Sequence, residues 1–339
     1  MNQTNSTSHS NTKIPRSTGA PSRAQAPDHP SNTPPHKPKS CLTALLAICC
    51  CALLTIGSYF FIHNLNQTAQ NLPEITQNTH NIGNQPPYNF NYSWANEHPY
   101  IAHALGGIMG ETYTNSYEAF LLNYQLGQRV FEIDFMMTDD GETVAMHGEE
   151  QWRDNLQDRP DEAFTTNNFL SKLFNDQYHT ITYRTIIDIM SKYPDIYLVT
   201  DSKYTDEAHV SAEFNQIISY AKEHDPAVLD RFIIQIYHPE MLDWVMELYP
   251  WKSVIYTLYQ DPNWTPENVV EFAQASGVKI ITINGNELNQ QPATAELWND
   301  HGLTIAAFTL NDLNFVQKLR RDFGVKLIYT DFLLPGREV

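Results

Sequence analysis

Cysteine is confined to one short stretch of this 339-residue chain, at Cys41, Cys49, Cys50 and Cys51. Its absence after residue 51 excludes a disulfide framework and a cysteine-based zinc site from the rest of the chain. Basic residues are also few, with 21 Lys and Arg against 39 Asp and Glu and a net charge of -18. Because duplex binding depends largely on basic side chains that neutralise phosphates, this balance argues against a nucleic-acid partner.

The basic residues are unevenly distributed along the chain. Residues 1–40 contain five of them and a single acid, Asp28, whereas all later residues together carry a net charge of -22. The same forty residues are rich in Ser, Thr, Asn and Pro and have almost no large apolar side chains. Such a segment cannot bury enough surface to offset its chain entropy. We therefore expect residues 1–40 to form a disordered basic tail.

Charged residues are absent from residues 41–62, CLTALLAICCCALLTIGSYFFI. A helix of this length rises about 33 Å, enough to cross a hydrocarbon core of about 30 Å. A cleaved signal peptide is the alternative, but no small-x-small cleavage site follows the apolar run. A lipoprotein signal ending at Cys49 is disfavoured by Ile48, which stands where a small residue is expected. We favour an uncleaved transmembrane anchor.

The residues that flank this apolar segment predict its orientation. Lys37 and Lys39 lie just before it, and the next basic residue is Arg129. The positive-inside rule then predicts a single-pass protein with a cytoplasmic N-terminus and an extracytoplasmic (periplasmic or extracellular) main domain. Residues 63–95 are rich in Asn and Gln and nearly uncharged, which predicts a flexible linker. Residues 96–339 form the predicted main domain.

Within this domain, short β-branched runs alternate with amphipathic stretches. The helix-like stretches are residues 116–126, 181–193, 207–223, 239–249, 265–275, 292–300 and 311–322. About eight such strand–helix units over roughly 240 residues predict an α/β fold of the (β/α)8 TIM-barrel type. An open doubly wound sheet is the alternative, but no G-x-G-x-x-G loop follows the first strand.

Polar side chains end or interrupt several of these apolar strands, and barrels of this type place their active sites at the carboxyl ends of the strands. Each of these residues alone has an ordinary structural explanation, such as a hydrogen-bonded histidine or a surface ion pair. Together, three carboxylates are hard oxygen ligands suited to Mg²⁺ or Ca²⁺, two histidines could exchange protons, and a lysine could hold an anion. The residues are His103, Glu132, Asp134, His147, Asp201 and Lys203.

The motifs around these residues, IAHALGG, TNSYEAF and FEIDFMMTDDGETVAMHG, resemble those of the glycerophosphodiester phosphodiesterase family, within the phosphatidylinositol-phospholipase-C-like superfamily. The resemblance continues through LVTDSK, IAAFTLND and FGVKLIYTDF and covers roughly residues 100–332. The matching positions in the first motifs are His103, Asn115, Ala119, Phe120, Glu132, Asp134, Thr138, Gly141 and His147.

The resemblance implies a metal-dependent phosphoric diester hydrolase that acts on a glycerophosphodiester or a phospholipid headgroup. It implies that Glu132, Asp134 and Asp201 hold one divalent cation, Ca²⁺ or Mg²⁺. In the same way it assigns acid/base catalysis to the two histidines, His103 and His147. It also implies that Lys203 is the positively charged residue that binds the substrate.

The sequence departs from the family pattern at four positions. Ala104 stands where the family has an arginine after the first histidine, and Gly148 stands where an aspartate follows the second. Thr114 replaces a glutamate of the helix motif, and Asp201 replaces a metal-binding glutamate. Two alternatives therefore stay open: a sphingomyelinase-D-like phospholipid phosphodiesterase, which also pairs an acid with a lysine two residues later, and a non-catalytic barrel that binds a metal or ligand.

Overall fold

The computed structural model describes residues 88–156 and 158–337. The predicted basic tail, the predicted anchor at residues 41–62 and most of the predicted linker lie outside these ranges. Within them, no helix combines the length and the apolar character needed to cross a membrane.

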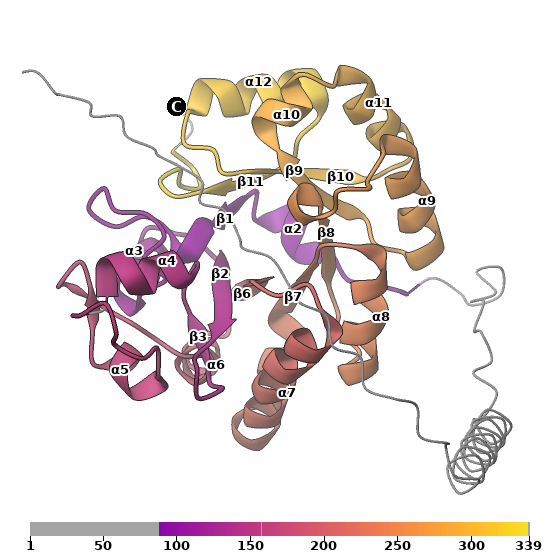
Figure 1. The fold of residues 1–339 in the computed structure, drawn as a ribbon. Helices are drawn as coiled ribbons and strands as arrows, with labels where there is room; N and C mark the ends of the chain where they lie inside the picture. Colours follow the sequence, from indigo (N-terminus) through magenta and orange to yellow (C-terminus); the bar gives the residue numbers. More distant parts are fainter. Residues whose placement is uncertain (1–87, 157, 338–339) are drawn as a thin grey trace, which may run out of the picture. The chain divides into compact units, whose positions relative to one another are not determined.

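A closed barrel of eight parallel strands forms the centre of the domain (Figure 1). The strands pair in the order β1-β11-β10-β9-β8-β7-β6-β2, and the ring closes where Ala102 of β1 pairs with Phe131 of β2. A short strand, β3 (Thr143–Ala145), runs antiparallel beside β2. The predicted TIM barrel is thus confirmed. The eight strands are β1 (Tyr100–Ala102), β2 (Val130–Met137), β6 (Tyr197–Ser202), β7 (Phe232–Ile236), β8 (Val254–Thr257), β9 (Ile280–Asn284), β10 (Thr304–Phe308) and β11 (Leu327–Thr330).

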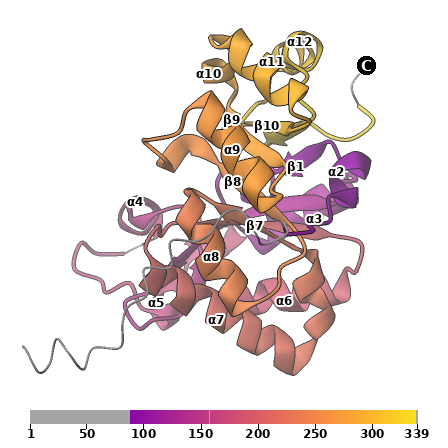
Figure 2. The ribbon, with the colours of Figure 1, turned by 90° about the vertical axis from the view of Figure 1, so that its right-hand side faces the viewer.

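Helices surround this barrel, and the two perpendicular views show them outside the strands (Figures 1 and 2). The main ones are α3 (Tyr117–Gln125), α6 (Tyr183–Lys192), α7 (Glu207–His224), α8 (Pro239–Leu248), α9 (Pro266–Ser276), α11 (Pro292–Asp300) and α12 (Leu313–Phe323). Shorter helical segments are α2 (Ser93–Glu97), α4 (Glu149–Gln151), α5 (Thr166–Leu170), α10 (Gly285–Asn289), η1 (His103–Leu105), η2 (Trp152–Leu156), η3 (Pro226–Arg231) and η4 (Leu258–Gln260). A small hairpin, β4 (Leu173–Phe174) and β5 (Tyr178–His179), lies in the segment between β3 and α6.

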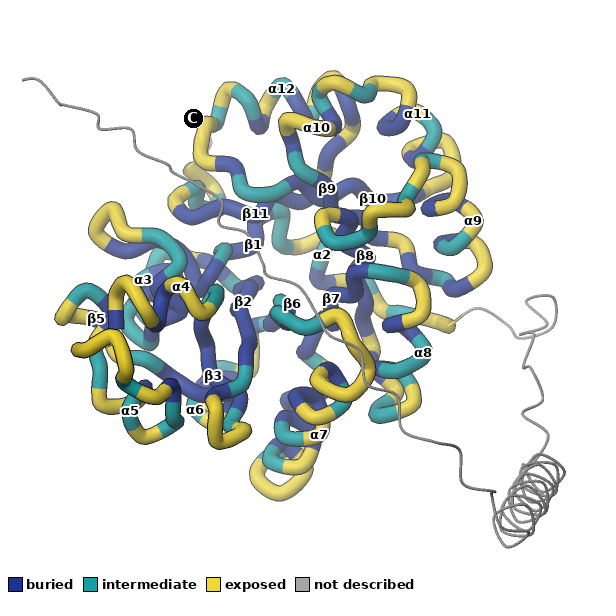
Figure 3. Tube along the Cα trace, viewed as in Figure 1, coloured by how far each residue is buried: buried dark blue, intermediate teal, exposed yellow. Residues whose placement is uncertain are grey.

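The strands are apolar on both faces, as a parallel sheet covered by helices requires. Their outward side chains pack against the helices, and their inward side chains fill the barrel with a separate apolar cluster that includes Ile101, Val199 and Ile233. The strands are accordingly buried along most of their length (Figure 3). Toward the carboxyl ends the inward positions become polar, because period-two alternation continues from Val130 to Glu132 and Asp134 on β2.

The structured domain begins earlier than the sequence indicates. Residues 88–95 fall in the predicted flexible linker, yet Trp94 of α2 is only 2% exposed and donates a hydrogen bond from Nε1 to Ser253 Oγ at 2.9 Å. Tyr92 adds a second contact through its hydroxyl, which donates to the carbonyl of Val254 at 2.8 Å. The composition of this segment does not reveal these contacts, because its buried aromatic residues stand among Asn and Gln.

Candidate active site

Three acidic side chains meet at the carboxyl end of the barrel. Glu132 and Asp134 project inward from β2, and Asp201 projects inward from β6, where it is the register partner of Asp134. Each of the three offers a carboxylate oxygen, and these oxygens lie within 4.8 Å of one another. The sequence correctly predicted that these three residues come together.

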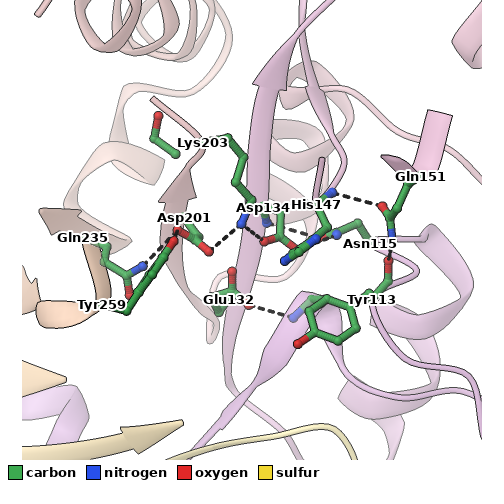
Figure 4. Close-up of polar contacts among 12 residues, drawn as sticks. Tyr113, Asn115, Glu132, Asp134, His147, Gln151, Asp201, Lys203, Gln235 and Tyr259 are labelled. Atoms are coloured by element: carbon green, nitrogen blue, oxygen red, sulfur yellow. Dashed lines mark hydrogen bonds and ion pairs between the residues drawn. The ribbon is translucent and has the colours of Figure 1, made fainter. Parts of the chain in front are cut away.

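Lys203 reaches into the same cluster from the residue after β6 (Figure 4). Its Nζ lies 2.5 Å from Asp134 Oδ1 and 2.8 Å from Asp201 Oδ2. Burial lowers the pKa of this ammonium, but the two carboxylates outweigh burial and hold the pKa well above its ordinary value. Burial raises the pKa of Asp134, which is fully buried. The charge of Lys203 outweighs this effect, together with the two histidines and the Asn115 hydrogen bond, and the pKa lies below its ordinary value. Lys203 is therefore a fixed positive charge inside the acidic cluster.

Glu132 is held differently from its neighbours. Its Oε2 accepts a hydrogen bond from the backbone N–H of Ala104 at 2.7 Å, whereas its Oε1 is buried with no hydrogen-bond partner. Burial and the nearby Asp134 charge raise the pKa of this carboxyl to about 8. Three hard oxygen donors with one orphaned buried oxygen fit a divalent cation such as Mg²⁺ or Ca²⁺, which would stabilise the charged form of Glu132.

Further side chains hold Asp134 and Asp201 in place. Asn115 makes a two-point contact with Asp134: its Nδ2 donates to Asp134 Oδ2 at 2.7 Å, and its Oδ1 accepts from the Asp134 backbone N–H at 3.1 Å. Across the barrel, Asp201 Oδ1 accepts from the Tyr259 hydroxyl and from Gln235 Nε2, both at 3.1 Å. The sequence singled out Asn115 as a motif match only, and it carried no signal for Gln235 of β7 or Tyr259 of η4.

His103 lies just after β1, in the short turn η1. Its Nδ1 lies 2.9 Å from Asp331 Oδ1, and Asp331 Oδ2 accepts from Asn311 Nδ2 at 2.7 Å. Burial lowers the pKa of His103, but the Asp331 hydrogen bond and the charges of Glu132 and Asp134 raise it to about 9. Sequence reasoning did not identify Asp331 as a site residue, although the Thr-Asp pair at the end of the last strand could have indicated it.

His147 follows β3 and is more exposed than His103, at 40% of its side chain. Its Nδ1 lies 2.9 Å from Glu150 Oε1, and its backbone N–H donates to Gln151 Oε1 at 3.0 Å. In Figure 4 its ring stands beside Asp134. Glu150 supplies the carboxylate that the sequence lacks at Gly148, and sequence reasoning did not identify it.

A cavity of about 50 Å³ opens into the barrel beside this cluster. His103, Glu132 and Asp201 line it, while His147 is not among its lining residues. The hydroxyls of Thr257 and Thr282, also in the lining, are buried without hydrogen-bond partners. The other lining residues are Gln235, Tyr259, Phe308, Thr309 and Tyr329.

Comparison with known families identifies the family of this domain. The model of the glycerophosphoryl diester phosphodiesterase family matches residues 107–334. The chain belongs to this family. The resemblance inferred from the motifs is thus confirmed, and the protein is a phosphoric diester hydrolase of the glycerophosphodiester phosphodiesterase type.

Solved structures of glycerophosphodiester phosphodiesterases share the fold. The enzyme from Parabacteroides distasonis superposes with a TM-score of 0.55 at 17% identity, over 69% of this chain and 92% of its own. A phosphodiesterase from Oleispira antarctica, solved with the product sn-glycerol-3-phosphate, gives 0.55 at 19% identity over 68% and 92%. The enzyme from Thermotoga maritima gives 0.52 at 19% identity over 69% and 94%. No curated protein matches the sequence.

Proposed function

We propose that this family member hydrolyses a glycerophosphodiester by metal-dependent two-histidine acid/base catalysis. One P–O bond of the diester is broken, and the departing alkoxide oxygen takes up a proton to become the alcohol. A new P–O bond forms to the oxygen of the attacking water, which gives up a proton. The observation that carries the proposal is the convergence of His103, the three carboxylates and Lys203 on one end of the barrel. A glycerophosphodiester substrate is consistent with the family match.

We assign the cation to Glu132, Asp134 and Asp201. When bound there, a divalent cation supplies positive charge that offsets the negative charge of the phosphodiester. Lys203 adds a second positive charge in the same cluster and would bind a phosphoryl oxygen. These charges matter because the chain as a whole is strongly acidic and would otherwise repel an anionic substrate.

The two histidines are the proposed proton-transfer groups. Asp331 accepts the hydrogen bond at Nδ1 of His103, which leaves Nε2 of that ring for the substrate. Glu150 engages Nδ1 of His147 in the same way. One imidazole would take a proton from the attacking water and the other would protonate the leaving alkoxide.

The test is turnover by the full-length chain in detergent, with Mg²⁺ or Ca²⁺ and after EDTA. The substrates are glycerophosphocholine, glycerophosphoglycerol, lysophosphatidylcholine and bis(p-nitrophenyl) phosphate, with the released alcohol and phosphomonoester identified. We expect release of glycerol phosphate from the first two. Turnover of lysophosphatidylcholine alone would support the sphingomyelinase-D-like alternative instead, and no turnover of any diester with either cation would support a non-catalytic barrel.

For the segments outside the described ranges, we propose that residues 1–40 are a cytoplasmic tail, that residues 41–62 cross the membrane and that residues 63–87 link the anchor to the barrel domain. The support is the uncharged apolar stretch with Lys37 and Lys39 before it. The barrel domain would then meet its substrate outside the cytoplasm.

A further inference from the structure

Tyr113 lies between the two histidines. It belongs to the loop between β1 and α3, and its ring is edge-on to both imidazoles, with centroids 4.5 Å from His103 and 4.7 Å from His147. Sequence patterns do not single out this residue, because the contact joins one loop to the ends of two different strands.

Neighbouring groups hold Tyr113 in this position. Its carbonyl accepts a hydrogen bond from Gln151 Nε2 at 2.9 Å, and Oε1 of the same glutamine accepts from the His147 backbone N–H. Two residues later, Asn115 is tied to Asp134. Both loop residues adopt left-handed backbone conformations, with φ of 57° at Tyr113 and 46° at Asn115. Asparagine adopts this conformation readily, whereas tyrosine rarely does. The ring position is therefore fixed from several sides.

The hydroxyl of Tyr113 is a hydrogen-bond donor that has no acceptor among the described residues. No residue in the described part of the chain hydrogen-bonds it. In Figure 4 the ring points from its loop back toward Glu132. Burial, and then the charges of Asp331, Asp134 and Glu132, raise the pKa of this phenol, so that it stays protonated at neutral pH.

The position after His103, which is an arginine in the family pattern, has no side chain that could bind a phosphate here. Ala104 follows His103 where the family pattern has arginine; its methyl side chain is fully buried, and its N–H is engaged by Glu132. A hydrogen-bond donor between the two proton-transfer groups would stabilise the charge on a phosphoryl oxygen held there. The ring contacts with His103 and His147 show that Tyr113 lies between these two groups.

We propose that the Tyr113 hydroxyl donates a hydrogen bond to a non-bridging phosphoryl oxygen of the substrate and so serves in place of the missing arginine. This inference rests on the proposed diesterase function. A neutral phenol binds an anion less strongly than a guanidinium but donates along one direction, which favours the substrate oxygen that lies between the histidines.

Tyr113→Phe tests this role because it keeps the ring between the histidines and removes only the hydroxyl. We expect kcat/KM to fall about 10- to 100-fold, as for a lost hydrogen bond to a charged group. A contact to a non-bridging oxygen should cost the same factor with an alkyl and with a p-nitrophenyl leaving group. Tyr117→Phe, on the first turn of α3, is the matched control and should change kcat/KM by less than about twofold.

Binding of inorganic phosphate gives a readout that does not need turnover. We expect Tyr113→Phe to weaken phosphate binding, measured by calorimetry on the full-length chain, with an unchanged thermal midpoint. Wild-type kcat/KM and phosphate affinity in this variant would overturn the inference, as would a loss confined to alkyl leaving groups. If the wild-type chain cleaves no diester, the proposed function fails, whereas phosphate binding still decides the role of Tyr113.

Discussion

Gly148 leaves the space that Glu150 occupies. A Cβ built on Gly148 would collide with the Glu150 carboxylate, the same group whose Oε1 lies 2.9 Å from His147 Nδ1. The glycine backbone has φ near -178°, an extended conformation open to any residue, so that only the space requires glycine there. The absent aspartate and the present glutamate are thus two parts of one local arrangement.

Gly148→Ala should displace the Glu150 carboxylate and reduce turnover about tenfold, because the His147 ring loses the group that orients it. Glu150→Gln should have a similar effect, and the double variant should be little worse than either single one. The measurement is kcat on the preferred diester. Glu149→Gln, at a side chain 77% exposed, is the control. Full activity in both single variants would contradict a positioning role for Glu150.

Asp134→Asn should abolish turnover, because it removes one charge from the proposed cation site. The fold should survive, since Asn115 can still hydrogen-bond the amide, and circular dichroism with a thermal melt would check it. We expect Asp201→Glu, which lengthens the side chain to that of the family pattern, to keep or raise the affinity for the cation. Wild-type activity that persists after prolonged EDTA treatment would disprove the cation dependence.

His103→Ala and His147→Ala should each lower turnover by about 10²- to 10⁴-fold, the usual contribution of a proton-transfer group. The double variant should be little worse, because the pair acts as a unit. A p-nitrophenyl leaving group needs little protonation, so it should rescue the variant that lost the general acid and not the other. Near wild-type rates in both variants on every diester would make the histidines structural.

Glu213 of α7 should make the stability of the fold depend on pH. It is fully buried, its Oε2 accepts from Ser202 Oγ at 3.2 Å, and its Oε1 has no partner. Burial raises its pKa well above the ordinary value, so the folded state keeps a proton that the unfolded state releases. The resulting destabilisation is absent below the ordinary pKa and grows as pH rises above it.

Glu213→Gln cannot ionise and should therefore gain stability over the wild type as pH rises. We expect the difference in free energy of unfolding to increase by on the order of 1 kcal/mol between pH 4 and pH 7, measured by urea denaturation. Glu207→Gln, at the exposed first turn of α7, is the control and should show no such trend. A constant difference across this range would mean that Glu213 ionises as freely in the folded protein as in the unfolded chain.

The predicted topology can be tested with reporters fused after residue 95. A reporter that is active only after export should be active, and one that is active only in the cytoplasm should be silent, because the positive-inside rule predicts that Lys37 and Lys39 keep the N-terminus in the cytoplasm. The reverse pattern would overturn the charge argument, and Lys37→Glu with Lys39→Glu would then be expected to have no effect on orientation.

The sequence by itself determined the barrel and its acidic cluster. Parallel strands covered by helices need continuous apolar runs, and helices between them need an amphipathic period, so both are visible locally. Glu132, Asp134 and Asp201 were predictable because each interrupts an apolar strand near its carboxyl end, where a barrel gathers such residues.

Only the tertiary structure decided which side chains complete the site. His103 and Asp331 are 228 residues apart and meet because the first strand pairs with the last. Tyr113 reaches both histidines only through a loop held in left-handed conformations, and Glu150 reaches His147 through the space left by Gly148. These contacts depend on barrel closure and on loop geometry, which local patterns of polarity do not encode.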